Sequence, residues 1–193
     1  MKIITISREY AAGGHSIGQR VAKELGIEFY DRDIIRETAK ATGMDISQIE
    51  KAEETFSRKD SILQTITPIS YEQKDALFDY QSAIILKFVE TRAPFVLLGR
   101  SANVILREAG IESLNVFIYS SEAHRMARAG ELLNLTSPGE ILRAMKKIDH
   151  DRRTYYTHYT GRRWGDVHDY DLALDSGVLG YDTCVKLICE AAQ

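Results

Sequence analysis

Short apolar runs that alternate with amphipathic segments form the main hydrophobic pattern of the chain. The runs predict five strands, over residues 2–6, 28–30, 94–98, 114–119 and 172–174. The run at 94–98 (PFVLL) is unbroken, as is typical of a central parallel strand covered on both faces. Between the runs, apolar residues recur at helical spacing, as Ile17, Val21 and Leu25 do. Strands separated by helices predict a doubly wound, mostly parallel α/β sheet.

Capping residues and glycines set the boundaries of the predicted helices. They predict helices over 16–25, from Asp31 to about Thr42, from Ser70 onward, after Ser120 or Ser121, from Ser137 through the 140s, and over 181–191. Asp45 and Gln48 form a capping box for a further short helix, and Ser70 and Gln73 form another. Residues 55–70 show no clear period, so we expect an excursion from the sheet there.

The composition is that of an ordinary globular protein with one domain. The chain has 193 residues and a formal net charge of −3, which gives no global attraction to nucleic acid or to an anionic membrane. Cys184 and Cys189 lie on one predicted helix at a spacing that fits neither a metal site nor a CxxC motif, so we expect buried thiols. The N-terminus shows no signal-peptide pattern, and no apolar run is long enough to span a bilayer. We therefore expect a cytoplasmic location.

Ligands of doubly wound sheets bind at the carboxyl ends of the strands, so the residues that follow each strand are candidates for a site. Arg100 follows the strongest predicted strand, and a guanidinium is suited to bidentate contact with a phosphate or a carboxylate. The alternative is a solvated surface arginine. Asp31 follows the second strand, where it can cap the next helix or meet a ligand hydroxyl or amine.

The segment from Ser7 to Ser16 joins the first strand to the first helix, which is where a phosphate-binding loop lies in P-loop proteins. The standard pattern G-x-x-x-x-G-K-[ST] is not met. In register, Arg8 stands at the first glycine, Gly13 at the second and Gly14 at the lysine. The candidate phosphate-binding residues are Ala12, Gly13, Gly14, His15 and Ser16, and Ser16 matches the hydroxyl that meets Mg²⁺. The alternatives are a plain glycine turn and a serine that caps the helix.

Basic residues are frequent in the last third of the chain. Arg125 and Arg128 are three apart on one predicted helix. An ordinary solvated helix face explains this pair of arginines at least as well as a functional role does. The run from Lys146 to Arg153 mixes basic residues with aspartates, and mixed signs favour local ion pairs. Tyrosines at 155, 156 and 159 permit base stacking, but such residues more often pack a lid or an interface. We do not expect nucleic acid as a partner.

Several specific motifs follow one another along the chain. They are Y-D-R-D-I-I at 30–35, L-L-G-R-S at 97–101, V-F-I-Y-S-S-E-A-H-R at 116–125, D-x-x-R at 149–152 and Y-D-L-A-L-D-S-G-V-L-G at 170–180. S-R-E-Y stands at 7–10, G-G-x-x-I-G at 13–18 and Y-Y-x-x-Y-T-G-x-x-W-G-D at 155–166. This order resembles the cytidylate kinase family, and most of all its divergent cytidylate kinase-like branch. The resemblance covers nearly the whole chain.

The resemblance implies a five-stranded P-loop kinase sheet in a single domain, with a helical monophosphate-binding region at about 44–92 and a lid at about 129–168. It also implies roles for individual residues. Arg100 falls in the stretch that supplies an arginine to the monophosphate, although the aspartate that follows it in the family is Ser101 here. The D-x-x-R of the lid matches Asp149 and Arg152, the helix arginine matches Arg125, and the acidic residue after the second strand matches Asp31.

We therefore expect transfer of the γ-phosphoryl group of ATP to a nucleoside monophosphate, CMP or dCMP, with Mg²⁺ as cofactor. The family's P-loop lysine has no counterpart, and Arg8, His15 or Arg152 can replace its charge as catalytic residues. Acceptor binding is assigned to Asp31, Arg100, Arg125 and Asp149. Two alternatives stay open, a nucleotide-binding protein without turnover and a kinase for another small acceptor. The sequence also leaves a homodimer open.

Overall fold

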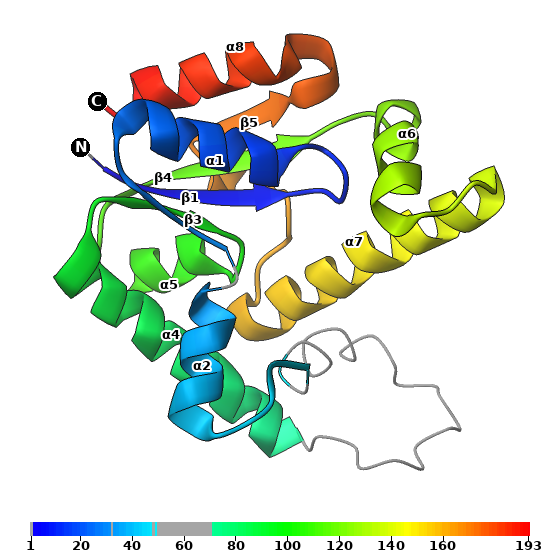
Figure 1. The fold of residues 1–193 in the computed structure, drawn as a ribbon. Coiled ribbons are helices and arrows are strands. Elements are labelled where there is room, and N and C mark those ends of the chain that lie inside the picture. Colours follow the sequence, from blue (N-terminus) through cyan, green and yellow to red (C-terminus); the bar gives the residue numbers. More distant parts are fainter. Residues whose placement is uncertain (1, 32, 48, 50–70) are drawn as a thin grey trace.

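Five parallel strands form one sheet in the computed structural model, which describes residues 2–31, 33–47, 49 and 71–193 (Figure 1). The strands are β1 (Ile3–Arg8), β2 (Glu28–Tyr30), β3 (Phe95–Leu98), β4 (Ser113–Tyr119) and β5 (Leu172–Asp175). Their order is β2-β3-β1-β4-β5, and every neighbouring pair is parallel. The five predicted strands and the doubly wound sheet are thus confirmed.

Helices cover both faces of this sheet (Figure 1). α1 (Gly14–Leu25) and α8 (Ser176–Ala191) pack on one face, and α4 (Tyr71–Arg92) and α5 (Ala102–Glu108) pack on the other. Successive side chains of a strand point to opposite faces. Val96 and Leu98 therefore belong to the core under α1 and α8, whereas Phe95 and Leu97 belong to the core over α4 and α5. Two cores explain why β3 is apolar at every position.

Three helices differ in extent from the predictions. α1 begins at Gly14, two residues before the predicted start, because the preceding glycine ends the loop with φ 86°. α8 begins at Ser176, five residues early, because the Asp175 carboxylate accepts the first N–H groups of the helix. It is kinked at Gly180, which adopts a non-helical conformation. α7 (Pro138–Thr160) continues well beyond the 140s.

The predicted helix caps are found in part. Ser121 caps α6 (Glu122–Leu133) by accepting the His124 N–H at 3.2 Å, so the second of the two candidate serines is the cap. Ser137 occupies the cap position of α7, but its side chain makes no capping bond. Asp45 accepts the Ser47 N–H at 2.8 Å, at the start of the predicted short helix. The remaining predictions, which concern Gln48, Ser70 and residues 55–70, lie outside the described residues.

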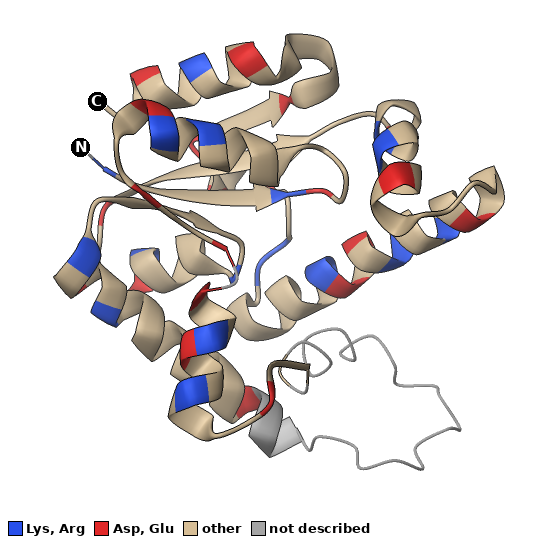
Figure 2. Cartoon of the chain, viewed as in Figure 1, with Lys and Arg blue, Asp and Glu red and all other residues tan. Residues whose placement is uncertain are grey.

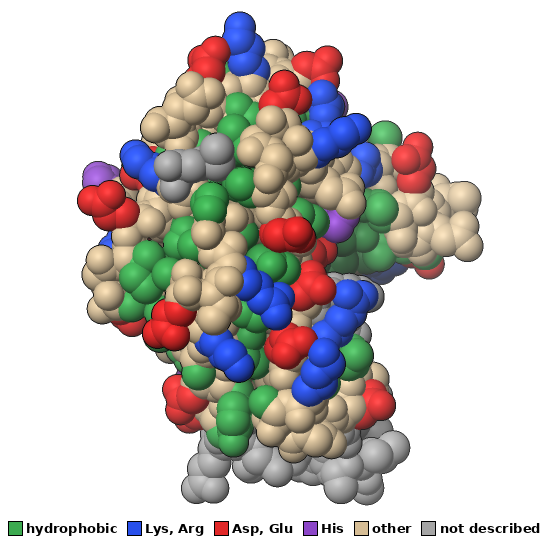
Figure 3. Space-filling model, turned by 60° about the vertical axis from the view of Figure 1, so that its left-hand side comes forward, with side chains coloured by type: hydrophobic (Ala, Val, Ile, Leu, Met, Phe, Trp, Pro, Cys, Tyr) green, Lys and Arg blue, Asp and Glu red, His purple; other side chains and the backbone are tan. Residues whose placement is uncertain are grey.

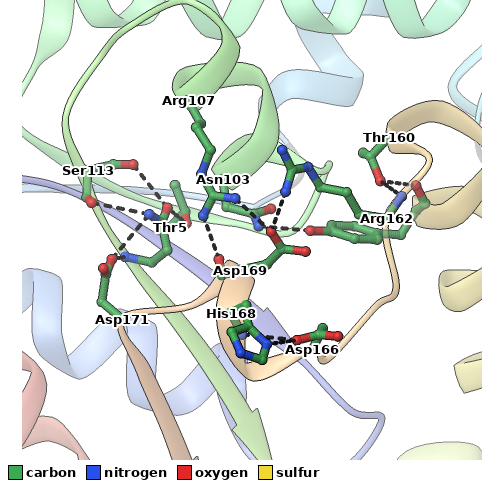
Figure 4. A network of polar contacts seen from close by, with 12 residues as sticks. Thr5, Asn103, Arg107, Ser113, Thr160, Arg162, Asp166, His168, Asp169 and Asp171 are labelled. Atoms are coloured by element: carbon green, nitrogen blue, oxygen red, sulfur yellow. Dashed lines mark hydrogen bonds and ion pairs between the residues drawn. The ribbon is translucent and has the colours of Figure 1, made fainter.

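α6 and α7 lie beyond the carboxyl ends of the strands, and α2 (Asp33–Thr42) follows β2 at the same edge (Figure 1). A polar network holds the carboxyl end of α7 (Figure 4). Asn103 of α5 donates to the Tyr156 hydroxyl at 3.0 Å. Asp169 of η2 (Val167–Asp169) accepts from Arg107 at 2.6 Å and from Arg162 at 2.7 Å. The end of α7 is thereby fixed against α5.

The two cysteines take the place that the sequence predicts. Cys184 and Cys189 are free thiols buried in the core between α8 and α1, and burial raises the pKa of each. Their role is to pack that core. Among the described helices, none is both long and apolar enough to cross a membrane.

Candidate active site

The loop between β1 and α1 is shaped by two glycines. Gly13 adopts φ 86°, in the left-handed region that disfavours any side chain. A Cβ atom on Gly13 would lie 2.2 Å from the Tyr181 ring, and one on Gly14 would lie 2.6 Å from the Cβ of Arg8. Only glycine allows these side chains to approach the backbone so closely. α1 starts here, and the N–H groups of its first turn have no partner within the helix, so they can meet an anion.

A buried ion pair between α6 and α7 holds the first half of the loop. Arg125 donates to the Asp149 carboxylate at 2.5 Å and to the Tyr10 carbonyl at 3.2 Å. The same carboxylate accepts the Tyr10 N–H at 2.7 Å. Glu9 accepts the Ser120 N–H at 3.2 Å and lies 3.4 Å from Arg125, and burial raises the pKa of Glu9. Both polar groups of the Tyr10 backbone are thus fixed by side chains from distant elements.

The second half of the loop is held from α6 and α8. Ser176 donates to the Ala12 carbonyl at 2.7 Å. Arg128 Nη2 donates to the Ser16 hydroxyl at 3.0 Å, and its guanidinium lies 5.8 Å from the centre of the Tyr181 ring. The loop is therefore supported along its length before any ligand is bound.

A pocket of about 440 Å³ opens at the carboxyl ends of β1 and β3. Four of its lining side chains are basic, two are acidic and three are tyrosine or tryptophan. They are Ser7, Arg8, Asp31, Ile35, Gly99, Arg100, Ser101, Lys147, Ile148, Asp151, Arg152, Tyr155, Tyr156 and Trp164. Elsewhere charges of both signs are interspersed, along α7 (Figure 2) and over the face drawn in Figure 3. The excess of cations is thus a local property of the pocket.

Two of the basic residues, Arg8 and Arg152, crowd each other. Arg152 Nη1 donates to the Arg8 carbonyl at 3.1 Å, and its guanidinium lies 5.6 Å from the centre of the Tyr10 ring. Burial, together with the charge of Arg152, lowers the pKa of Arg8 well below its ordinary value, to about 9, which leaves it protonated at neutral pH. Burial also lowers the pKa of Arg152. An anion placed beside such desolvated charges would stabilise both of them.

The turn after β3 directs Arg100 into the same pocket. Gly99, Arg100 and Ser101 have φ values of 77°, 62° and 52°, a left-handed run that is unusual for residues with side chains. Each such residue costs on the order of 1 kcal/mol, and strained backbone of this kind is concentrated at functional sites. A Cβ atom on Gly99 would lie 2.5 Å from Arg8 Nη1, so the glycine also makes room for the Arg8 guanidinium.

Asp31 links the pocket to the phosphate-binding loop. Its carboxylate lies 2.9 Å from His15 Nδ1, while the residue also lines the pocket. His15 stands in the first turn of α1 with about half of its side chain exposed (53%), and its ring meets the edge of Phe29. The pair therefore joins the two regions that the sequence analysis assigned to the two substrates.

The structure brings four of the predicted site residues together in the pocket, namely Arg8, Asp31, Arg100 and Arg152. Ala12, Gly13, Gly14, His15 and Ser16 form the end of the loop and the start of α1. Arg125 and Asp149 lie against the outside of the loop and are not among the pocket-lining residues. Their assignment to acceptor binding stays a prediction.

Several residues of the site were not predicted. Lys147 and Asp151 form an ion pair at 2.6 Å in the pocket wall, next to Tyr155. The signal for them was the i, i+4 spacing of these three residues, which places them on one face of α7. Arg128 and Tyr181 support the loop. The sequence predicts a helix at each position and leaves Arg128 open between a functional role and a solvated helix face. Only the fold shows that they meet.

A parallel sheet of this order, with a glycine loop at the amino end of α1 and a basic pocket beside it, is the architecture of the P-loop kinases. Shikimate kinase from Acinetobacter baumannii, solved in complex with shikimate, has the same fold, with a TM-score of 0.55 at 15% identity over 99% of this chain and 92% of that chain. An uncharacterized protein from Eubacterium ventriosum has a TM-score of 0.75 at 23% identity, over 100% of this chain and 98% of that chain.

The sequence comparisons give the family. A model of the cytidylate kinase-like family matches residues 3–178, so the chain belongs to that family. The cytidylate kinase of Thermoplasma volcanium is 25% identical over 178 residues, which cover 90% of this chain and 82% of that protein. The resemblance seen in the motifs is thereby confirmed, and the chain is a member of a family of kinase-like phosphotransferases.

Proposed function

We propose that this protein transfers the γ-phosphoryl group of ATP to a nucleoside monophosphate, CMP or dCMP. One observation carries the proposal. Arg8, Arg100 and Arg152 converge in a pocket beside the amino end of α1, so that a donor phosphate on the loop and an acceptor phosphate in the pocket would be neighbours. Phosphoryl transfer needs positioning and neutralisation of charge more than covalent chemistry by the protein.

The residues divide into three groups in this proposal. The N–H groups from Gly13 to Ser16 hold the donor phosphates. Arg100 holds the acceptor phosphate, and Arg8 and Arg152, which lie between, neutralise the charge on the group in transfer. Tyr155, Tyr156 and Trp164 offer apolar surface to the acceptor's base and sugar, and the region 129–168 serves as the lid.

The loop offers the phosphates of ATP the N–H groups of the first turn of α1, which have no partner within the helix. Gly13 and Gly14 are themselves buried, under the Tyr181 ring and the Arg8 side chain. The fit of Mg²⁺ at Ser16 is poor, because the Ser16 hydroxyl already accepts a hydrogen bond from Arg128. Among the described residues, no group of three or more His, Cys, Asp or Glu side chains is arranged to hold a metal ion.

A coupled assay of ATP consumption tests the proposal. The acceptors are CMP, dCMP, UMP, AMP and GMP, with shikimate and gluconate as acceptors that are not nucleotides. We expect turnover with CMP or dCMP, and lower kcat/KM with the other nucleotides. Turnover with shikimate or gluconate alone would refute the nucleotide acceptor, and ATP binding without turnover on any acceptor would refute the kinase activity.

One observation favours a second candidate, a kinase whose acceptor is a hydroxyl group. Asp31 lines the pocket and is paired with His15, and a carboxylate in that position can accept the proton of an acceptor hydroxyl. A phosphate acceptor needs no such base at neutral pH. Asp31→Asn separates the two, because it should abolish kcat for a hydroxyl acceptor but mainly raise KM for a nucleoside monophosphate.

The phosphate-binding loop has a matched pair of glycine variants. Gly13 and Gly26 are left-handed glycines at opposite ends of α1, but a Cβ atom meets the Tyr181 ring at Gly13 and nothing within 4 Å at Gly26. Gly13→Ala should therefore weaken ADP binding at least tenfold (about 1.4 kcal/mol). Gly26→Ala should lower stability by about 1 kcal/mol and leave affinity unchanged. Equal ADP affinities of Gly13→Ala and Gly26→Ala, measured by calorimetry, would show that the donor nucleotide does not bind at this loop.

A further inference from the structure

Arg128 stands at the position where the P-loop pattern expects a metal ion. Its Nη2 donates to the Ser16 hydroxyl at 3.0 Å, and its guanidinium lies over the Tyr181 ring that covers Gly13. It therefore contacts Ser16 in the first turn of α1 and lies near the α8 side chain that packs on Gly13. A guanidinium carries five N–H donors, so donors remain for a ligand after the bond to Ser16.

α6 fixes the place of this guanidinium. Arg125, one helical turn earlier, is buried and bonded to Asp149 and to the Tyr10 carbonyl. Because residues three apart share a helix face, the anchoring of Arg125 directs Arg128 toward the loop. The position of Arg128 is thus built into the fold rather than left to a solvated side chain.

A guanidinium and a metal ion on the same Ser16 hydroxyl would compete for it and repel each other. Mg²⁺ binds oxygen at 2.0–2.1 Å and is usually held by one or two carboxylates in addition to phosphates. At that distance from the Ser16 hydroxyl the ion would lie within about 5 Å of a fixed positive charge, with repulsion in place of a carboxylate. Arg128 supplies the same sign of charge without a metal.

We propose that Arg128 is the cation of the phosphate-binding loop: it contacts the nucleotide phosphates directly, and it takes the place of a divalent ion bound by Ser16. This inference rests on the proposed binding of a nucleotide at the loop. It assigns to Arg128 the positive charge that the sequence analysis expects from Mg²⁺ and from Arg8, His15 or Arg152. Nucleotides should consequently bind to this loop in the absence of divalent cations.

Equilibrium binding of ADP, measured by calorimetry in EDTA and in excess MgCl₂, tests the inference. Wild-type protein should bind ADP with nearly the same affinity in both. Arg128→Ala should bind ADP about tenfold or more weakly in EDTA, the loss expected for one charge-assisted contact, and should regain part of it in MgCl₂. The control Arg143→Ala removes the same charge from an exposed site on α7 and should match wild type in both buffers.

Two further variants separate a binding role from a structural one. Ser16→Ala removes the hydroxyl that holds Arg128, so any loss of ADP affinity should be the same in EDTA and in MgCl₂, whereas loss of a metal ligand at Ser16 would lower the affinity only in MgCl₂. Arg128→Lys keeps the charge but not the planar group, and should fall between wild type and Arg128→Ala in EDTA.

The outcomes distinguish the inference from the function on which it rests. ADP binding by wild type that requires MgCl₂, or that is unchanged in a folded Arg128→Ala, overturns the inference alone. No ADP binding by wild type in either buffer overturns the proposed function, and the inference with it.

Discussion

The phosphate-binding loop and the pocket beside it are built in opposite ways. Around the loop, side chains find their partners within the protein, as Arg125 does on Asp149 and Arg128 on Ser16. In the pocket, Arg8 and Arg152 crowd each other, and burial lowers the pKa of both. The loop is therefore complete before a ligand arrives, whereas the pocket gains electrostatic stabilisation when an anion enters it.

The difference suits the two tasks of a kinase. Donor phosphates are best held by groups that need no rearrangement during the reaction, and a supported loop provides them. In the proposed function an acceptor must enter, react and leave, and buried charges that an anion stabilises favour its bound state. Substitutions in the two regions should accordingly change stability in opposite directions.

The largest effect is expected from Asp149→Ala, which leaves Arg125 buried without its carboxylate. Removing one partner of a buried ion pair costs about 3–5 kcal/mol, so unfolding in urea should shift by that amount. Asp182→Ala is the control, because Asp182 pairs with Arg20 on the surface and such a pair contributes at most about 1 kcal/mol. Equal free energies of unfolding for the two variants would contradict a structural role for the Arg125–Asp149 pair.

Arg152→Ala tests the catalytic side of the pocket. If Arg152 neutralises charge that develops on the phosphoryl group, kcat should fall about a hundredfold while ATP affinity changes little. Arg153 is the neighbouring exposed arginine, over the Trp164 ring, and Arg153→Ala should keep kcat. A full kcat in both variants would assign Arg152 to the support of the Arg8 carbonyl alone.

Arg100→Ala should act on the acceptor. Loss of a charge-assisted phosphate contact raises the acceptor KM about ten- to a hundredfold, with little change in the KM for ATP. The KM for ATP, measured on the same variant, is the control for the KM of the acceptor. An equal rise in both would place Arg100 in contact with the donor instead.

The smallest effect, and the one of opposite sign, is expected from Arg8→Met. Folding lowers the pKa of Arg8 from its ordinary value to about 9, so its charge opposes folding at every pH below about 9 and this cost is relieved above it. At neutral pH the variant should be more stable by about 1 kcal/mol in thermal unfolding without ligand. Wild type should gain stability from inorganic phosphate and the variant should not. A variant less stable than wild type would mean that groups of the protein already stabilise the positive charge of Arg8 in the ligand-free pocket.

Much of the fold was predictable because its signals are local. Each strand is an apolar run, and each predicted helix has periodic apolar residues or a cap. The length of α7 was not predictable, because its last turns are held by contacts across the fold. Tyr159 stacks on Phe78 of α4 with ring centroids 4.1 Å apart, and Tyr155 donates to Gln81 at 3.0 Å. No period in the sequence carries that information.

The candidate site was predictable where topology decides it. The rule that ligands bind at strand ends located Arg8, Asp31 and Arg100, since the carboxyl ends of parallel strands meet at one edge. The supports of the loop were missed. Arg128 lies on a predicted helix, and arginine is a common residue on the solvated faces of helices. Tyr181 lies 168 residues along the chain from Gly13, the glycine that it covers. Only packing distinguishes these residues from ordinary surface positions.

The order of synthesis adds a consequence of the supported loop. The loop is encoded within the first sixteen residues, but Ser176 and Tyr181, which pack on it, come from the last helix of the chain. During synthesis the loop therefore emerges long before the residues of α8 that pack on it. We expect that a nascent chain does not retain nucleotide until α8 has left the ribosome, and that fragments ending before α8 carry the loop without its affinity.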